Sequence, residues 1–157
     1  MAKEQDHPNI SPRVHPPLVA VFFIVLAYFL GRFVPLPFVI PTVLQYFGLA
    51  LTLVGFLLGI GAFLEFRKAH TTLDPHGSAK QLVTAGIYRF TRNPIYLGFL
   101  LMVIGCPLNS GVIWGLLLAP FYMMTMSRLV IEKEEAYLEK KFGKTYLSYK
   151  SRVRRWL

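Results

Sequence analysis

The sequence feature that most limits the fold is a long apolar run without a charged side chain, which extends from Val43 to Leu64. A helix needs about 20 mainly apolar residues to cross the hydrocarbon core of a bilayer, with roughly 17 tolerated. This run meets that length. The chain of 157 residues is also 54% hydrophobic, above the usual apolar share of soluble domains. We therefore expect a single domain that is embedded in a membrane.

Further apolar blocks accompany this run. They are Leu18 to Leu30 with a continuation from Val34 to Leu44, Pro94 to Pro107, and Gly111 to Ser127. The block that starts at Pro94 is short and could begin as early as Thr91. The stretch from Pro107 to Gly111 is rich in turn-forming residues, which predicts a hairpin between the last two blocks. The sequence thus predicts an all-α, polytopic membrane protein with four transmembrane helices.

The chain divides into a polar leader and the membrane domain. We expect residues 1–15 to form a flexible N-terminal leader and residues 16–157 to form one domain. The first apolar block is too long for the apolar part of a cleaved signal peptide, so it should remain as an anchor. In the apolar run from Val43 to Leu64, Gly55 and Gly59 lie four residues apart. This spacing predicts a smooth face where another helix packs closely.

The basic residues lie on one side of the four predicted helices. Of the 17 Lys and Arg residues, all but Arg32 fall in the leader, in the loop after the second block or in the C-terminal tail. Cytoplasmic loops carry an excess of Lys and Arg, so we expect both termini in the cytoplasm. The net charge of +9 is also compatible with a nucleic-acid partner. Because the basic residues flank membrane segments, contact with anionic lipid explains them, and we expect no nucleic acid.

Metal and disulfide chemistry have no sequence signature in this chain. Cys106 is the only cysteine, and the four histidines lack the spacing of a metal site. We therefore expect no bound metal.

Asn93 and Pro94 stand where the third apolar block begins. Proline suits the first turn of a helix and asparagine is a favoured N-cap, so helix initiation alone could explain the pair. The same geometry leaves free N–H groups and the positive end of the helix dipole at the membrane surface, where a carboxylate can bind. Tyr88 and Tyr96 flank the pair. They are either interface aromatics or aromatic faces that stabilise a cation.

The tail from Ser127 to Lys150 has a helical, amphipathic pattern. Its apolar stripe contains Ile131, Leu138 and Phe142. Glu134 and Glu135 follow Ile131 by three and four residues, so they share this stripe. Two acids on an apolar face are costly unless each has a partner.

Two kinds of partner remain open for these acids. The first is a structural ion pair with Arg92, Arg128 or Lys141. The second is a polar, cationic ligand that is held against the membrane and donates hydrogen bonds to one of the two acids.

The motifs in the second half of the chain resemble those of a known enzyme group. They are Leu82-Val83-Thr84-x-Gly86-x-Tyr88, Arg92-Asn93-Pro94-x-Tyr96-x-Gly98, Glu134-Glu135, and Phe142-Gly143-x-x-Tyr146-x-x-Tyr149. Their order and spacing resemble the integral-membrane methyltransferases of the isoprenylcysteine carboxyl methyltransferase and phospholipid methyltransferase group. The resemblance covers roughly residues 71–155.

This resemblance implies S-adenosyl-L-methionine as cofactor and a lipophilic methyl acceptor in the bilayer. By the same resemblance, the cofactor site would contain Gln81, Leu82, Val83, Tyr88, Asn93, Pro94, Ile95, Tyr96, Glu134 and Glu135. Of the two acids, Glu134 is expected to face the cofactor more directly. The resemblance identifies no catalytic residue in this chain.

Two positions depart from the pattern of the eukaryotic isoprenylcysteine enzymes. Those enzymes have histidine where Asn93 stands, whereas the asparagine is similar to bacterial and phospholipid-type members and implies a bacterial inner membrane. Those enzymes also have a substrate-binding arginine four residues before the matching glutamate, where this chain has Val130. Arg128 is close in sequence and becomes the candidate substrate residue.

The sequence also bears on functions other than methyl transfer. The chain has no Gly-rich dinucleotide fingerprint and no Gly-x-Ser-x-Gly motif, which excludes a soluble-type methyltransferase fold and serine-based hydrolysis. The uncharged centres of the predicted spans are atypical of a transporter. The alternatives that remain are a phospholipid amine as methyl acceptor and a small, non-enzymatic membrane scaffold.

Overall fold

The structure is a computed structural model that describes residues 8, 14–37, 39–69 and 81–157. Most of the predicted leader, residues 1–15, and the loop residues 71–80 lie outside these described residues. Within the described part the regular structure is entirely helical. This confirms the predicted all-α class.

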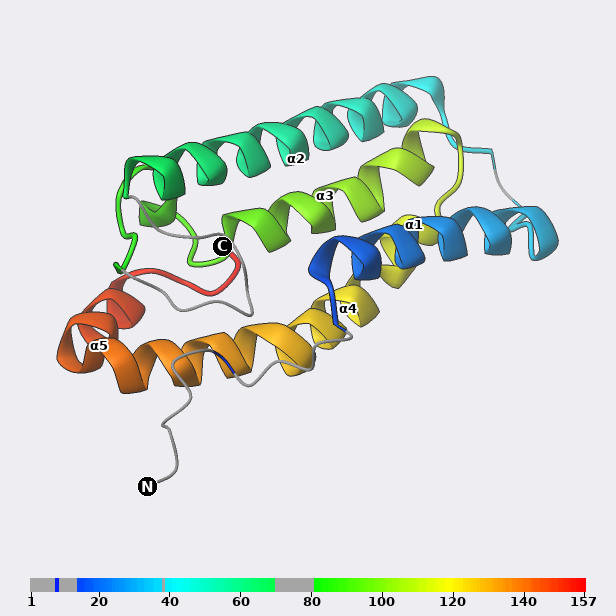
Figure 1. The fold of residues 1–157 in the computed structure, drawn as a ribbon. Helices are drawn as coiled ribbons and strands as arrows, with labels where there is room; N and C mark the ends of the chain where they lie inside the picture. The colour runs from blue at the N-terminus through cyan, green and yellow to red at the C-terminus, as the bar shows by residue number, and fades with distance from the viewer. Residues whose placement is uncertain (1–7, 9–13, 38, 70–80) are drawn as a thin grey trace.

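Five α-helices and two short helical segments follow one another along the chain. They are α1 (Pro16–Phe33), α2 (Thr42–Lys68), η1 (Gly86–Arg89), α3 (Pro94–Asn109), α4 (Trp114–Met126), η2 (Ser127–Ile131) and α5 (Glu132–Arg152). Helix α3 contacts α1, α2 and α4 and is therefore the centre of the bundle. Figure 1 shows α5 continuing from α4 past the end of the bundle where α3 begins.

The helices differ in whether they are long and apolar enough to cross a membrane. Among the described residues, α1, α2 and the continuous helical stretch that starts at Trp114 are long and apolar enough to cross a bilayer. Helix α3 is apolar but has only 16 residues. Many large apolar side chains on the outer faces are exposed, including Phe22, Phe29 and Phe121. The structure thus supports a membrane protein with three long spans and one shorter apolar helix.

Small residues allow α2 and α3 to approach closely. A Cβ atom added to Gly55 would lie 2.5 Å from the carbonyl oxygen of Gly98, and one added to Gly48 would lie 2.8 Å from that of Gly105. Among the described residues, no atom lies within 4 Å of a Cβ added to Gly59. The prediction of a smooth glycine face is therefore right for Gly55 and wrong for Gly59. The contact uses glycines seven residues apart, which lie on one face after two turns.

The boundaries of α3 follow the proline and glycine residues. Pro94 is the first helical residue, where its missing N–H leaves no helical hydrogen bond unmade. The block does not extend back to Thr91, which lies before the helix. After Asn109 the chain turns through Gly111, whose φ of +77° suits glycine. The predicted hairpin between α3 and α4 is confirmed.

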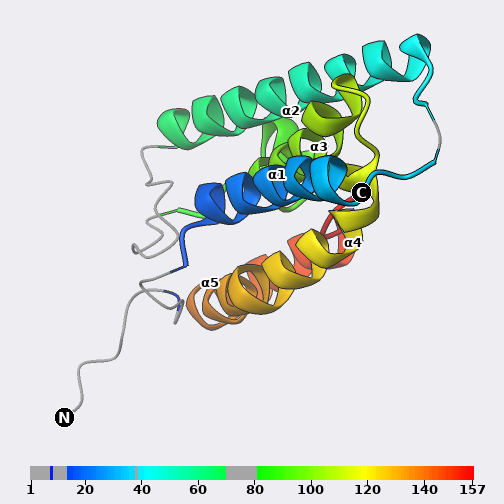
Figure 2. The same cartoon turned by 90° about the vertical axis from the view of Figure 1, so that its right-hand side faces the viewer.

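The tail is not the single regular helix that the amphipathic pattern predicts. It begins with the π-helical segment η2 and is kinked at Gly143, where φ is 50° and ψ is −126°. Only glycine adopts such angles without strain. Beyond the kink the chain reverses, and its last residues return to the start of α3, as Figures 1 and 2 show.

Candidate functional site

The two sequence motifs meet at the end of the bundle where α3 begins. The hydroxyl of Tyr96, in the first turn of α3, donates a hydrogen bond of 2.7 Å to Oε1 of Glu134 on α5. The backbone of the same turn is held from the other side, because the hydroxyl of Tyr122 on α4 donates to the carbonyl of Tyr96. The hydrogen bond between Tyr96 and Glu134 joins motifs that are 38 residues apart in the sequence.

The surroundings of Glu134 favour its protonated form. Burial raises the pKa of its carboxyl group to about 7, the hydrogen bond from Tyr96 lowers it, and the neighbouring charge of Glu135 raises it again. Burial has the largest effect, because removing a carboxylate from water disfavours the charged form. A cation placed beside this group would favour the ionised form instead.

Tyr88 lies in η1, close enough to Glu134 for the charge of the carboxylate to act on its hydroxyl. It is buried, its ring packs 5.6 Å from that of Phe66, and its carbonyl accepts a 2.7 Å hydrogen bond from the hydroxyl of Tyr149. Burial raises the pKa of the Tyr88 hydroxyl, and the nearby Tyr149 and Glu134 raise it further. Buried positions for Tyr88 and Tyr96 argue against a role as exposed interface aromatics.

Glu135 has a different set of partners from its neighbour. Its buried carboxylate receives two hydrogen bonds from Arg155, of 3.0 Å and 2.8 Å, and pairs with Arg92 at 3.1 Å. Lys150 lies 3.8 Å from the same group. The structural ion pair expected from the sequence is thus found for Glu135, with Arg92 among its partners. The contributions of Arg155 and Lys150 were missed, since sequence spacing gives no signal for them.

Asn93 occupies the N-cap position, but its side chain makes no capping hydrogen bond. Its Nδ2 instead donates to the carbonyl of Arg155 at 2.9 Å, which also accepts from the hydroxyl of Thr91 at 3.2 Å. The backbone N–H of Arg92 donates to the carbonyl of Arg154. A side-chain cap would use the amide oxygen as acceptor for an N–H of the first turn. The prediction of such a cap is wrong, because the side chain makes its contact with the returning C-terminal segment instead.

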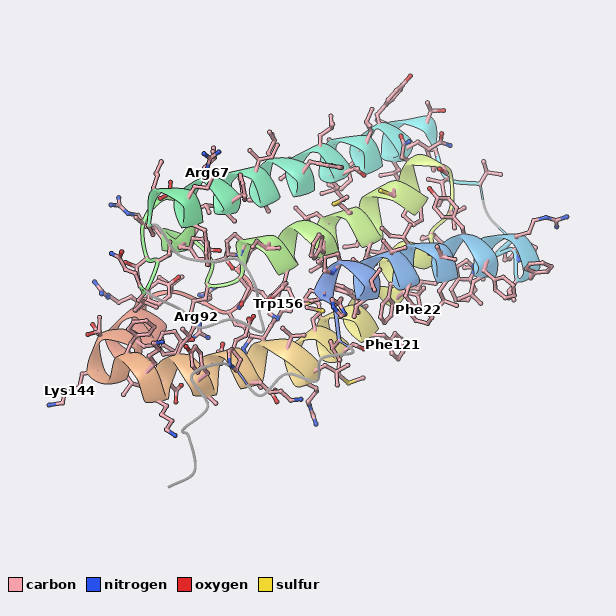
Figure 3. All side chains as sticks on the ribbon, in the orientation of Figure 1. Phe22, Arg67, Arg92, Phe121, Lys144 and Trp156 are labelled. Carbon is pink, nitrogen blue, oxygen red and sulfur yellow. The ribbon has the colours of Figure 1, made fainter. Side chains whose placement is uncertain are left out.

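Arg92 is enclosed between the start of α3 and α5, where Figure 3 labels it. Its side chain is 10% exposed. One nitrogen, Nη2, pairs with Glu135. Within the described part of the chain, Nε and Nη1 are buried and have no hydrogen-bond acceptor. Buried donors without acceptors are uncommon in folded proteins, so each one calls for a physical explanation.

The remaining predicted residues differ in how close they come to this cluster. Leu82 and Val83 are partly buried in the segment before η1, whereas Gln81 is exposed. Pro94 is buried and Ile95 is partly buried in the first turn of α3.

The candidate substrate residue lies apart from these groups. Arg128 is exposed on η2, and no contact between it and the Tyr96–Glu134 pair is found among the described residues. Val130 is fully buried in the apolar core.

The loop before α3 is shaped by a contact that sequence reasoning missed. Gly86 has a φ of +58°, and a Cβ atom added to it would lie 2.5 Å from Cδ of Glu65 at the end of α2. Any side chain at this position would displace Glu65 or the loop. Gly86 therefore fixes the approach of η1, and with it Tyr88, to α2.

The fold and the site define a helical membrane protein with a site of acids and aromatic residues at one end of its bundle. A model of the phospholipid methyltransferase family matches residues 43–145. The chain belongs to this family. The match includes both motifs that meet in the site, but it ends before the C-terminal residues that bind Asn93 and Glu135.

Named relatives support the same assignment. The chain is 32% identical over 85 residues to the protein-S-isoprenylcysteine O-methyltransferase of Schizosaccharomyces pombe, which covers 54% of this chain and 36% of the relative. It is 30% identical over 117 residues to protein-S-isoprenylcysteine O-methyltransferase B of Arabidopsis thaliana, covering 68% of this chain and 55% of the relative. An uncharacterized protein of Haemophilus influenzae is 38% identical over 63 residues. The matches thus span about a third to a half of the length of the two named enzymes.

Proposed function

We propose that this protein transfers a methyl group from S-adenosyl-L-methionine to a lipidic acceptor that reaches the site from the bilayer. The observation that carries the proposal is the hydrogen bond between Tyr96 and Glu134. It brings an acid and an aromatic ring together at the end of an apolar bundle. Membership of the phospholipid methyltransferase family supports the same class of reaction.

The residues of the site suit the chemical parts of this cofactor. When bound, S-adenosyl-L-methionine supplies a methyl group on a sulfonium cation. Glu134 offers a carboxylate whose ionised form a cation stabilises, and the rings of Tyr88 and Tyr96 offer aromatic faces for the same charge. The first turn of α3, at Pro94 and Ile95, presents the positive end of the helix dipole to a carboxylate.

Leu82 and Val83 complete the proposed site. Both are partly buried before η1 and offer apolar surface to the adenosine part of the cofactor, next to the exposed Gln81. Displacement at a methyl group needs little covalent chemistry from the protein. It needs the reacting atoms to be aligned and water to be excluded. Tyr96 serves alignment, because its hydrogen bond holds the carboxylate of Glu134 in one position.

The acceptor and the topology follow from the membrane setting. We infer four crossings with both termini in the cytoplasm, as in a bacterial inner membrane, because Lys and Arg gather at one end of the molecule. Figure 3 shows Arg67 and Lys144 at the end where the site lies, while Phe22 and Phe121 project from the bundle. A soluble cofactor would then enter from the cytoplasm and the acceptor from the lipid.

Two acceptor classes are proposed in order. The named relatives are isoprenylcysteine O-methyltransferases, which favours a lipid-linked carboxylate. The family model is that of phospholipid methyltransferases, which makes a phospholipid amine the second candidate. Val130 carries no charge, so Arg128, which is exposed on η2, stays the proposed residue for the charged part of the acceptor.

The test measures transfer of a labelled methyl group in lipid nanodiscs. N-acetyl-S-farnesylcysteine and phosphatidylethanolamine serve as the two acceptors. We expect label in one lipid product, and at least a tenfold lower rate for Tyr96→Phe. Tyr28→Phe is the matched control, since it removes a hydroxyl that bonds to the carbonyl of Cys106 elsewhere in the bundle. A parent protein that transfers no label to any lipid fraction would refute the proposed activity with these acceptors.

A further inference from the structure

Arg92 has more hydrogen-bond donors than the described residues around it have acceptors for. A guanidinium group carries five N–H donors, has no acceptor and stays charged. Here Nη2 pairs with Glu135 at 3.1 Å, while Nε and Nη1 are buried without an acceptor in the described part of the chain. A buried donor without an acceptor destabilises the folded state, and the cost is larger when the donor is charged.

Glu135 cannot satisfy Arg92 alone. Both of its carboxylate oxygens already accept hydrogen bonds from Arg155, at 3.0 Å and 2.8 Å, and Lys150 lies 3.8 Å away. Arg155 and Lys150 each have a second acid, Glu132 and Glu139 respectively. Among the described residues, the only ion pair of Arg92 is the one with Glu135, which Arg155 and Lys150 also contact.

The position of Arg92 is fixed beside the proposed cofactor site. Its backbone N–H bonds to the carbonyl of Arg154, and the next two residues form the start of α3. Its charge acts on the hydroxyl of Tyr149, where burial raises the pKa to about 12 and Arg92 opposes the increase. That hydroxyl bonds to the backbone of Tyr88, which lies near Glu134.

We propose that the Nε and Nη1 donors of Arg92 bind a carboxylate of a ligand in this site. The inference rests on the proposed function. A carboxylate would accept from two donors that have no acceptor among the described residues, and charge-assisted hydrogen bonds of this kind are among the stronger ones. The positive end of the α3 dipole adds to the same preference for an anion.

The carboxylate has two sources, the amino-acid part of the cofactor and an acidic lipid acceptor. The test uses one pair of probes for each source. The first pair is S-adenosylhomocysteine and its decarboxylated analogue, which keeps the amino group. The second pair is N-acetyl-S-farnesylcysteine and its methyl ester, measured with saturating S-adenosylhomocysteine. Affinities are determined in nanodiscs for the parent, Arg92→Gln, Arg92→Lys and Arg155→Gln.

The parent should bind the carboxylate member of one pair about 10- to 100-fold more tightly than its partner, the range expected for charge-assisted hydrogen bonds. Arg92→Gln should abolish this ratio, and Arg92→Lys should reduce it. Arg155→Gln also removes a cation from Glu135, so it controls for loss of the ion pair and should keep the ratio. If Arg92→Gln loses the affinity ratio in the first pair, Arg92 binds the carboxylate of the cofactor. If it loses the ratio in the second pair, Arg92 binds the carboxylate of the acceptor.

Other outcomes overturn the inference. If the parent and both Arg92 variants bind both pairs with unchanged ratios, Arg92 does not bind the carboxylate. If Arg92→Gln fails to fold, the ratio in Arg92→Lys decides, because lysine keeps the charge beside Glu135. A parent that binds neither S-adenosylhomocysteine nor its analogue contradicts the proposed function itself, and the inference falls with it.

Discussion

Glu134 and Glu135 are adjacent acids with different chemical surroundings. Glu135 is buried among Arg92, Arg155 and Lys150, which suits a structural ion pair. Glu134 accepts a hydrogen bond from Tyr96 and has a raised pKa, which suits a carboxyl group that ionises when a cationic ligand binds beside it. The two acids therefore require separate tests.

Glu134→Gln should weaken binding of S-adenosylmethionine by about 1.5–3 kcal/mol, the scale of a hydrogen bond to a charged group. The effect should depend on pH. Because the pKa of Glu134 lies at about 7, affinity of the parent should rise as pH increases through 7, where the carboxylate becomes ionised. The variant should show no such rise. Titration calorimetry from pH 6 to pH 8 measures both, as roughly one unit on either side of the pKa covers most of the transition.

Stability without cofactor should show the opposite trend. The pKa of Glu134 is higher in the folded state than its ordinary value of 4.5, so the folded state binds more protons between these values. Stability of the parent relative to Glu134→Gln should then fall as pH rises from about 4.5 to about 7. Glu132→Gln is the control, because Glu132 is half exposed. Identical pH profiles of the parent and Glu134→Gln would return Glu134 to a purely structural role.

Asn93→Asp tests the contact of the Asn93 side chain with the returning C-terminal segment. Aspartate caps about as well as asparagine, so a mere cap would tolerate the change. Here the substitution removes the Nδ2 donor and places a carboxylate against the carbonyl of Arg155. We expect a loss of about 1–3 kcal/mol, as for a buried hydrogen-bonding group left unpaired. Thermal unfolding measures it, with the exposed Asn109→Asp as control; equal melting temperatures would contradict the assigned contact.

At the scale of elements, the packing of α2 against α3 holds the first turn of α3 in place. Gly55→Ala would put Cβ 2.5 Å from the carbonyl oxygen of Gly98 and should destabilise the fold by about 1–3 kcal/mol, as overpacking does. Gly59→Ala is the same substitution in the same helix, but no atom of the described part of the chain lies within 4 Å of the added Cβ. Thermal unfolding in detergent should separate the two variants. Equal stabilities would show that the glycine contact does not govern this interface.

Sequence periodicity and composition were sufficient for the helices but not for the shape of the tail. The apolar block and Pro94 predicted where α3 begins, and the turn-forming residues up to Gly111 predicted the hairpin between α3 and α4. The kink at Gly143 was not predicted, because a glycine in an amphipathic pattern does not reveal a positive φ. The π-helical segment η2 adds a similar irregularity. Backbone angles of this kind depend on tertiary contacts that periodicity does not contain.

At the scale of the whole molecule, the site depends on contacts between distant parts of the chain. The motifs around Tyr96 and Glu134 could be predicted from the sequence, since each has a local pattern. The contacts of Arg155 with Asn93 and Glu135 could not, because they join residues 62 and 20 positions apart. Trp156, which Figure 3 labels, packs against the apolar core and so helps to hold this segment.

Topology is a second property of the whole molecule. The proposal of four crossings requires α3, with its 16 residues, to cross as part of a hairpin with α4. Reporter fusions after Leu157 and at Ser110 test this, since the basic ends should remain in the cytoplasm. We expect a cytoplasmic signal from the first fusion and a signal from the opposite side at Ser110. The same side for both fusions would contradict the hairpin.

The central claim is that the end of the bundle at Tyr96 and Glu134 binds the cofactor of a methyltransferase. The most direct measurement is calorimetric titration of the purified protein with S-adenosylhomocysteine. We predict saturable binding of one ligand per chain, which Glu134→Gln weakens and Tyr28→Phe leaves unchanged. Absence of binding to the folded parent protein, or equal binding by the parent and Glu134→Gln, would contradict it.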